Sequence, residues 1–170
     1  VFCYEFNGYW KDVGTISSLW EANMEVLDPE HSGIDIFDEN WKIYSRNSGM
    51  TGHKIGSNAV VENSMITDGC RIDGSIKHSI LFSGVRVEKG AKIEDAVVMG
   101  KTVIKAGAVV EHCIVAENVV IGENAVVGSM PKGEEHGVAT IGSGITIGKG
   151  AKIGPNAMVN KNVEDGEEQW

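Results

Sequence analysis

Basic residues are scarce in this chain of 170 residues, where 15 lysines and arginines stand against 24 aspartates and glutamates and the net charge is −9. Nucleic acids and anionic membranes attract proteins through cationic surfaces, so this shortage argues against both as partners. No apolar run approaches the roughly 18 residues of a membrane-spanning helix, and no signal peptide is visible. The composition therefore favours a compact cytoplasmic protein.

Cysteine is also sparse. The three cysteines, Cys3, Cys70 and Cys113, are odd in number and lack the spacing of metal ligands, so they indicate no metal site. Cys113 falls at the fourth position of a six-residue repeat, and this position needs a small interior side chain. We therefore expect it to be buried as a small apolar residue.

A six-residue aliphatic pattern recurs four times, starting at Val61, Ile76, Ile93 and Val110. The first and sixth positions are branched aliphatics, and the fourth is small in every copy: Ser64, Ser79, Ala96 and Cys113. Another aliphatic residue follows eleven positions after each start: Ile72, Val87, Ile104 and Ile121. Units this short cannot bury their own apolar side and must stack on their neighbours. The pattern predicts a solenoid of parallel β-structure in which these four aliphatics lie one above another.

Turn residues support the same repeat. Eight positions after each start come Gly69, Gly84, Lys101 and Asn118. A turn here needs a positive φ, which glycine and asparagine tolerate best. Lys101 is the exception, and we expect the neighbouring Gly100 to take the strain.

The pattern resumes with a strict six-residue step at Ile141, Ile147, Ile153 and Val159, so three faces complete one triangular turn. This is a hexapeptide repeat, and residues 55–163 resemble the left-handed parallel β-helix family. The handedness comes from that resemblance, because ordinary parallel crossovers are right-handed. Residues 128–138 break the rhythm and predict a projecting loop. Residues 164–170 are expected to be a frayed tail unless Trp170 pins it down.

The residues before the solenoid follow a different pattern. Apolar residues at helical spacing predict an amphipathic helix over residues 15–27, with Ser18 and Glu21 at capping-box spacing. Because the solenoid has its own core, we expect the apolar face of this helix to dock on another domain and to be bare without it. Alternation at residues 41–44 predicts a short strand, with Trp41 and Tyr44 packed on the solenoid or on a neighbouring subunit.

The segment Gly8-Tyr-Trp-Lys-Asp-Val-Gly-Thr-Ile16, followed by Leu19-Trp-Glu-Ala-Asn23, resembles the closing motif of the catalytic domain in glucose-1-phosphate adenylyltransferases, also called ADP-glucose pyrophosphorylases. The resemblance continues through residues 41–44 and 74–83. It implies four parts: residues 1–27 end a nucleotidyltransferase domain, 28–54 are a linker, 55–163 are the β-helix domain and 164–170 are a tail. The start at Val1 rather than Met fits an expectation that a catalytic portion precedes this chain.

That resemblance implies transfer of an adenylyl group from ATP to glucose 1-phosphate, giving ADP-glucose for glycogen and releasing pyrophosphate. Asp12 matches a catalytic carboxylate that helps to bind Mg²⁺, and Trp10 is expected to contact substrate. Mg²⁺ would neutralise the phosphate charges and fix their geometry. One carboxylate cannot make such a site, and a second Asp and a Gly-rich triphosphate loop are expected upstream. We therefore expect this chain alone to be inactive and to hold no cofactor.

For the β-helix, the family resemblance implies assembly of a tetramer and binding of anionic metabolite effectors such as sugar bisphosphates. The basic candidates for effector binding are Arg46, Lys54, Arg71, Lys77, His78, Arg86 and His112. Members activated by fructose bisphosphate carry an arginine near the His112 position. A histidine there is largely neutral near pH 7 and binds an anion less strongly. The exposed end coils of a solenoid also predict a homo-oligomer.

Two alternatives stay open at this stage. A hexapeptide-repeat acyltransferase would use His78, His112 or His136 as a base between coils. The segment of residues 8–16 argues against it. The other alternative is a non-catalytic, regulatory paralogue of the pyrophosphorylase, and retention of Asp12 argues against that one.

Overall fold

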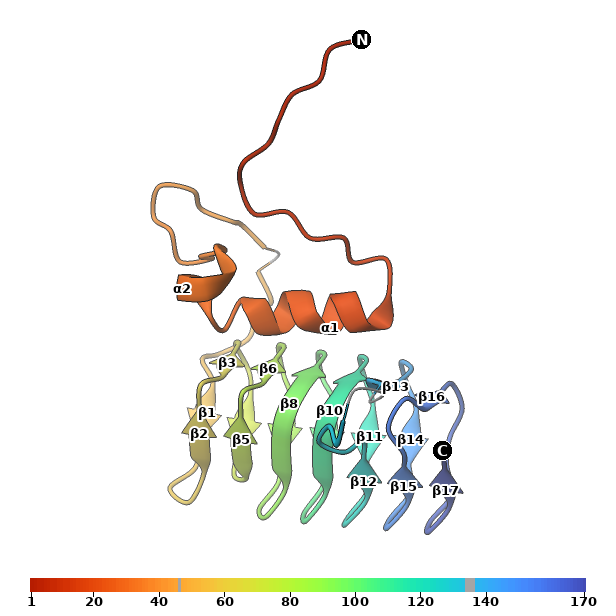
Figure 1. Cartoon of the computed structure of the whole chain (residues 1–170). Coiled ribbons are helices and arrows are strands. Elements are labelled where there is room, and N and C mark those ends of the chain that lie inside the picture. Colours follow the sequence, from red (N-terminus) through yellow and green to blue (C-terminus); the bar gives the residue numbers. More distant parts are fainter. Residues whose placement is uncertain (46, 134–136) are drawn as a thin grey trace.

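The computed structural model describes residues 1–45, 47–133 and 137–170. From Lys54 onward the chain winds as a left-handed parallel β-helix of about seven coils, preceded by one helix of ten residues and one of four (Figure 1). Within those described ranges, every strand pairing is parallel, and no helix is long and apolar enough to cross a membrane. The predicted fold class is confirmed.

The β-helix has three faces. The first face contains, in spatial order, β1 (Lys54–Ile55), β4 (Arg71–Ile72), β7 (Arg86–Val87), β9 (Val103–Ile104), β11 (Val120–Ile121) and β14 (Thr146–Ile147). The second contains β2 (Val60–Glu62), β5 (Ser75–Lys77), β8 (Lys92–Val98), β10 (Val109–Val115), β12 (Val126–Val127), β15 (Lys152–Ile153) and β17 (Glu168–Gln169). The third contains β3 (Met65–Ile66), β6 (Ile80–Leu81), the later halves of β8 and β10, β13 (Ala139–Ile141) and β16 (Met158–Val159).

The register between coils confirms the predicted stacking. Ile72 pairs with Val87, Val87 with Ile104 and Ile104 with Ile121, so these aliphatics form one ladder on the first face. In the later coil, Ile147 lies beside Ile121 on the first face. Three successive hexads therefore complete one turn, because Ile153 joins the second face beside Val127 and Val159 returns beside Ile141 on the third.

The core is the interior of the prism. Large aliphatics from all three faces are almost completely buried, and the small fourth positions Ser79, Ala96 and Cys113 are fully buried at the corners. Burial raises the pKa of the Cys113 thiol, so it stays protonated and unreactive near neutral pH. The expectation of a buried, structural Cys113 is confirmed.

The predicted turn corners adopt positive φ. Gly69 and Gly84 have φ of 75° and 79°, and Lys101 and Asn118 both have φ of 59°. The expectation that Gly100 would take the strain is wrong, because Lys101 itself is left-handed. Its backbone N–H donates to the Ser83 carbonyl on the coil before, at 2.9 Å, and this bond keeps the corner in register.

Helix α1 (Ile16–Glu25) begins at a cap that differs from the predicted one. The side chain of Thr15 accepts a hydrogen bond from the Ser18 N–H, and the Ser18 hydroxyl accepts one from the Thr15 N–H. The capping box is therefore Thr15 with Ser18, and the assignment to Ser18 with Glu21 is wrong. Thr15 has the extended backbone that a cap needs, with φ −124° and ψ 161°, whereas Ser18 already lies inside the helix.

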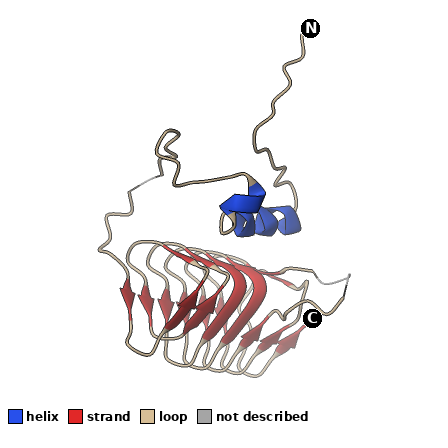
Figure 2. Cartoon of the chain, turned by 60° about the vertical axis from the view of Figure 1, so that its left-hand side comes forward, coloured by secondary structure: helices blue, strands red, loops and turns tan. Residues whose placement is uncertain are grey.

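The apolar face of α1 lies on the third face of the β-helix (Figure 2). Met24, Leu19 and Trp20 pack with Val97 and Ile114, which point outward from β8 and β10. The expectation that this face of the helix would be bare is therefore wrong. The helix docks here because the fifth position of each repeat is also aliphatic. These residues make the outside of this face apolar: Met65, Ile80, Val97 and Ile114.

The segment between α2 (Pro29–Ser32) and β1 contains no strand in its described residues, so the strand predicted at residues 41–44 is wrong. Trp41 and Tyr44 are 76% and 85% exposed, and they do not pack on the solenoid of this chain. Packing on a neighbouring subunit stays a prediction. Asp35 and Asp38 accept hydrogen bonds from backbone N–H groups two residues on, which favours turns over a strand.

The end of the chain is ordered into the solenoid, so the frayed tail predicted for residues 164–170 is wrong. Strand β17 pairs with β15, and an ion pair of 2.6 Å joins Glu168 to Lys152. The predicted loop at 128–138 is confirmed for its described residues, which contain no helix or strand between β12 and β13. Val138, at its end, is buried in the cluster under α1.

Candidate functional site

The segment of residues 8–15 folds back on the helix that it precedes. The Tyr9 hydroxyl donates to a Glu25 carboxylate oxygen at 2.6 Å, and the Lys11 ammonium donates to Glu21 at 2.9 Å and to Glu25 at 2.8 Å. The ammonium of Lys11, and then the hydroxyl of Tyr9, lower the pKa of Glu25. The same carboxylate raises the pKa of Lys11. These contacts fasten the side chains of Tyr9 and Lys11 to α1.

The residues that follow Tyr9 and Lys11 face solvent. Trp10 is 76% exposed, and Asp12 is exposed with one carboxylate oxygen accepting from the Gly14 N–H at 2.9 Å. Among the described residues, no group of three His, Cys, Asp or Glu side chains could hold a metal ion. Within the described part of the chain, Asp12 supplies a single carboxylate at this surface. Both predicted side chains are accessible, but they contact none of the other predicted site residues that the structure describes.

Trp20 anchors α1 to two adjacent coils. Its indole N–H donates to the Asp95 carbonyl at 2.7 Å, and its ring lies 4.4 Å from the His112 ring, tilted by 57°. His112 is only 7% exposed. The Asp95 carboxylate in turn contacts His78 Nδ1 at 2.5 Å. These corner residues share the third repeat position and positive φ, with values of 42° for His78, 52° for Asp95 and 44° for His112.

Because of these contacts, neither predicted histidine lies in an open anion site. His112 is covered by Trp20, and His78 is half-buried beside a carboxylate. Lys77 lies on another face, where it forms an ion pair of 3.0 Å with Glu94 that raises the pKa of Lys77. Arg46 and His136 lie outside the described residues.

Three of the predicted cations do come together, in what we call the basic ladder. Lys54 pairs in register with Arg71, and Arg71 with Arg86, on the first face. Neighbouring strands lie about 4.8 Å apart, so three like charges stack on one exposed surface. In the described part of the chain none of the three has an ion-pair partner, whereas five lysines do: Lys11, Lys77, Lys105, Lys149 and Lys152. Like charges in register repel, so an anion would be stabilising here.

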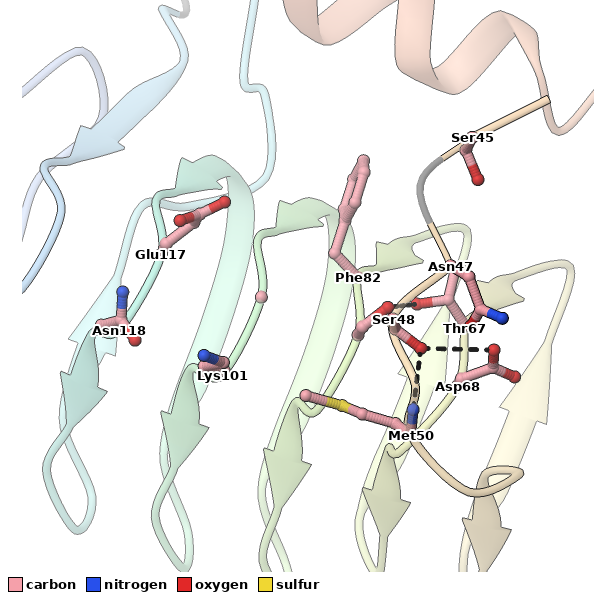
Figure 3. Close-up of a pocket in the computed structure, with 12 residues that line it drawn as sticks. Ser45, Asn47, Ser48, Met50, Thr67, Asp68, Phe82, Lys101, Glu117 and Asn118 are labelled. Carbon is pink, nitrogen blue, oxygen red and sulfur yellow. Dashed lines mark hydrogen bonds between the residues drawn. The ribbon is translucent and has the colours of Figure 1, made fainter. Parts of the chain in front are cut away.

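A groove of about 1050 Å³ runs along the corner that precedes the first face. Figure 3 shows its wall of corner residues from successive coils, with the linker residues Asn47, Ser48 and Met50 on the other side. We call it the corner groove. Sequence reasoning missed it, because the linker that closes it has no repeat and its path does not follow from periodicity.

These features define the chain as a hexapeptide-repeat β-helix protein with a helix mounted on one face. A family model described as GlmU-like, C-terminal hexapeptide, matches residues 48–148, which is more than half of the chain, and the chain belongs to this family. Hexapeptide-repeat domains of this kind are associated with transferases. The matched region contains the whole basic ladder, while α1 and the segment before it lie outside.

Proposed function

We propose that this chain is the C-terminal part of a glucose-1-phosphate adenylyltransferase. The observation that carries the proposal is the direct connection of residues 8–15 to α1 and of α1 to the β-helix. Tyr9 and Lys11 fasten the segment to the helix, and Trp20 fastens the helix to the corners at Asp95 and His112. The segment that resembles the end of a catalytic domain is thereby held in a fixed position over the solenoid.

In this proposal the exposed side chains of the segment face the reacting groups. Asp12 would give one carboxylate to a Mg²⁺ ion, which would offset the charge of the phosphates, and Trp10 would contact substrate. Since the described residues supply no further ligands, the chain by itself is expected to release no pyrophosphate. A cytoplasmic location stays a prediction from composition.

The β-helix serves in this proposal as the mount and as the effector-binding domain. We assign anionic effectors to the basic ladder, because Arg71 and Arg86 offer planar guanidinium groups that bind phosphate with paired hydrogen bonds. Lys77, His78 and His112 have structural partners and position the coils. The first coil also exposes Ile55, Val60 and Val61 at the open end of the solenoid, which supports assembly into a homo-oligomer.

The test compares this chain with the longer gene product expected to contain it. Each is incubated with ATP, Mg²⁺ and glucose 1-phosphate, and released pyrophosphate is measured. The longer protein should form ADP-glucose, and this chain should not. Pyrophosphate release by this chain alone, or a longer product without adenylyltransferase activity, would contradict the proposal. In the second case an upstream sequence without an intact triphosphate loop would favour the regulatory paralogue.

One observation favours an acyltransferase as the second candidate. His78 is held by Asp95 and lines a hollow of about 420 Å³ that also involves α1 and His31, and a histidine oriented by a carboxylate can act as a general base. Incubation with acetyl-coenzyme A and amino or hydroxyl sugars tests this candidate. Release of free coenzyme A that is lost in His78→Gln would support it, and no release is expected if the adenylyltransferase proposal holds.

A further inference from the structure

The corner groove has the shape of a site for an elongated ligand. Its wall comes from four successive coils, through Asp68, Ser83, Lys101 and Asn118. With coils about 4.8 Å apart, three steps extend about 14 Å along the solenoid axis. The backbone of this wall is already satisfied, since the N–H groups of Gly84, Lys101 and Asn118 donate to the coil before. Contacts to a ligand would therefore come from the side chains of the wall.

The lining of the groove is polar but close to neutral. It contains four hydroxyl groups, two amides, two carboxylates and one ammonium group, from Ser45, Ser48, Thr67, Ser83, Asn47, Asn118, Asp68, Glu117 and Lys101. Phe82 and Met50 add the apolar surface. Among these described residues two carboxylates accompany one cation, so the lining gives no net attraction for a phosphorylated ligand. An apolar ligand would cover the Lys101 ammonium, the Glu117 carboxylate and the Asn118 amide without giving them a partner.

Several of these polar groups have no partner of their own. In the described ranges, the side chains of Lys101, Glu117 and Asn118 take part in no hydrogen bond or ion pair. They project from two adjacent corners, as Figure 3 shows. Donors and acceptors on these corners, together with an aromatic ring that is 41% exposed at Phe82 in the same lining, match a chain of sugar rings. Such a chain has hydroxyl edges and apolar ring faces.

We propose that the corner groove binds a neutral oligosaccharide, with its hydroxyl groups on Lys101, Glu117 and Asn118 and a ring face on Phe82. The site is separate from the basic ladder, whose three cations lie on the flat first face. It does not depend on the proposed adenylyltransferase function. Either proposal can fail without the other.

The test is an NMR titration of this chain with maltohexaose and with cellohexaose, together with calorimetry. At least one hexasaccharide should bind and shift the backbone amide signals of residues 68, 84, 101 and 118. The double variant Lys101→Gly with Asn118→Gly should weaken binding about tenfold. Both positions have positive φ, which glycine tolerates, so the variant removes side chains without straining the fold.

Asn124→Gly is the matched control, because Asn124 also has positive φ, at 55°, and does not line the groove. It should bind as tightly as the unchanged chain. Absence of binding by both hexasaccharides at millimolar concentration would overturn the proposal, as would equal binding by the double variant. Fructose 1,6-bisphosphate that displaced a hexasaccharide from the corner amides would also overturn it, since the groove would then be an anion site.

Discussion

The first and third faces of the β-helix share one interior but have opposite exteriors. Inward, both present aliphatic ladders such as Ile72 to Ile121 on the first face. Outward, the third face presents Val97 and Ile114 and is covered by α1, whereas the first presents Lys54, Arg71 and Arg86 and stays open. The repeat thus fixes the fold through its inward residues, and the outward residues decide which face carries α1 and which stays open, where we propose effector binding.

The largest effect is expected where the two faces share the core. Ile104→Ala should destabilise the chain by about 2 to 5 kcal/mol, because Ile104 is fully buried and its neighbours cannot collapse into the space. Urea unfolding followed by circular dichroism measures the change. A loss below about 1 kcal/mol would contradict the described interior.

The exterior of the third face is tested at Trp20. Trp20→Ala should release α1, since it removes the hydrogen bond to Asp95 and the ring contact with His112. Hydrogen exchange at residues 16–25 should become much faster, while exchange on the first face should not change. Trp41→Ala is the control, because Trp41 is exposed and should leave α1 protected. Unchanged exchange in Trp20→Ala would show that this contact does not hold the helix.

A smaller effect is expected at the cap of α1. Thr15→Ala removes the side-chain acceptor for the Ser18 N–H and should cost about 1 kcal/mol of helix stability. Ser17→Ala is a suitable comparison, since Ser17 lies in the same exposed turn and is not a cap residue. Equal exchange rates for α1 in both variants would contradict the Thr15 cap.

The smallest change in stability is expected on the first face. Arg71→Gln removes the middle charge of the basic ladder, so repulsion from Lys54 and Arg86 should fall and the urea midpoint should rise slightly. Binding of fructose 1,6-bisphosphate, measured by calorimetry, should weaken about tenfold. Lys89→Gln is the matched control, because Lys89 is an exposed cation outside the ladder and should leave binding unchanged. Bisphosphate binding that survives in Arg71→Gln would remove the effector role of the ladder.

Much of the fold could be predicted from the sequence, because inward residues repeat with a fixed spacing. Even the basic ladder follows from that spacing, since each of its cations directly precedes an aliphatic of the first face, as Arg71 precedes Ile72. The docking of α1 could also be predicted from the adjacent aliphatics Val97 and Val98, because Val97 points outward and Val98 inward.

Other features depend on contacts that no repeat specifies. Trp41 and Tyr44 are apolar enough for a strand, but neighbouring aspartate side chains cap the local turns. The corner groove could not be predicted without the path of the linker. The order of the tail could not be predicted without the ion pair of Glu168 with Lys152. The role proposed for Asp12 could be predicted only from its motif. Ordinary turn residues also accept a hydrogen bond from an N–H two residues on, as Asp12 does from Gly14.

Asp12→Asn in the longer gene product tests whether the segment at residues 8–15 belongs to the proposed adenylyltransferase site. Asp38→Asn is the matched control, because Asp38 also caps a backbone N–H two residues on and lies outside the segment. We expect Asp12→Asn to lower kcat for ADP-glucose formation by at least about a hundredfold, and Asp38→Asn to leave it unchanged. Equal kcat values for the two variants would contradict this expectation.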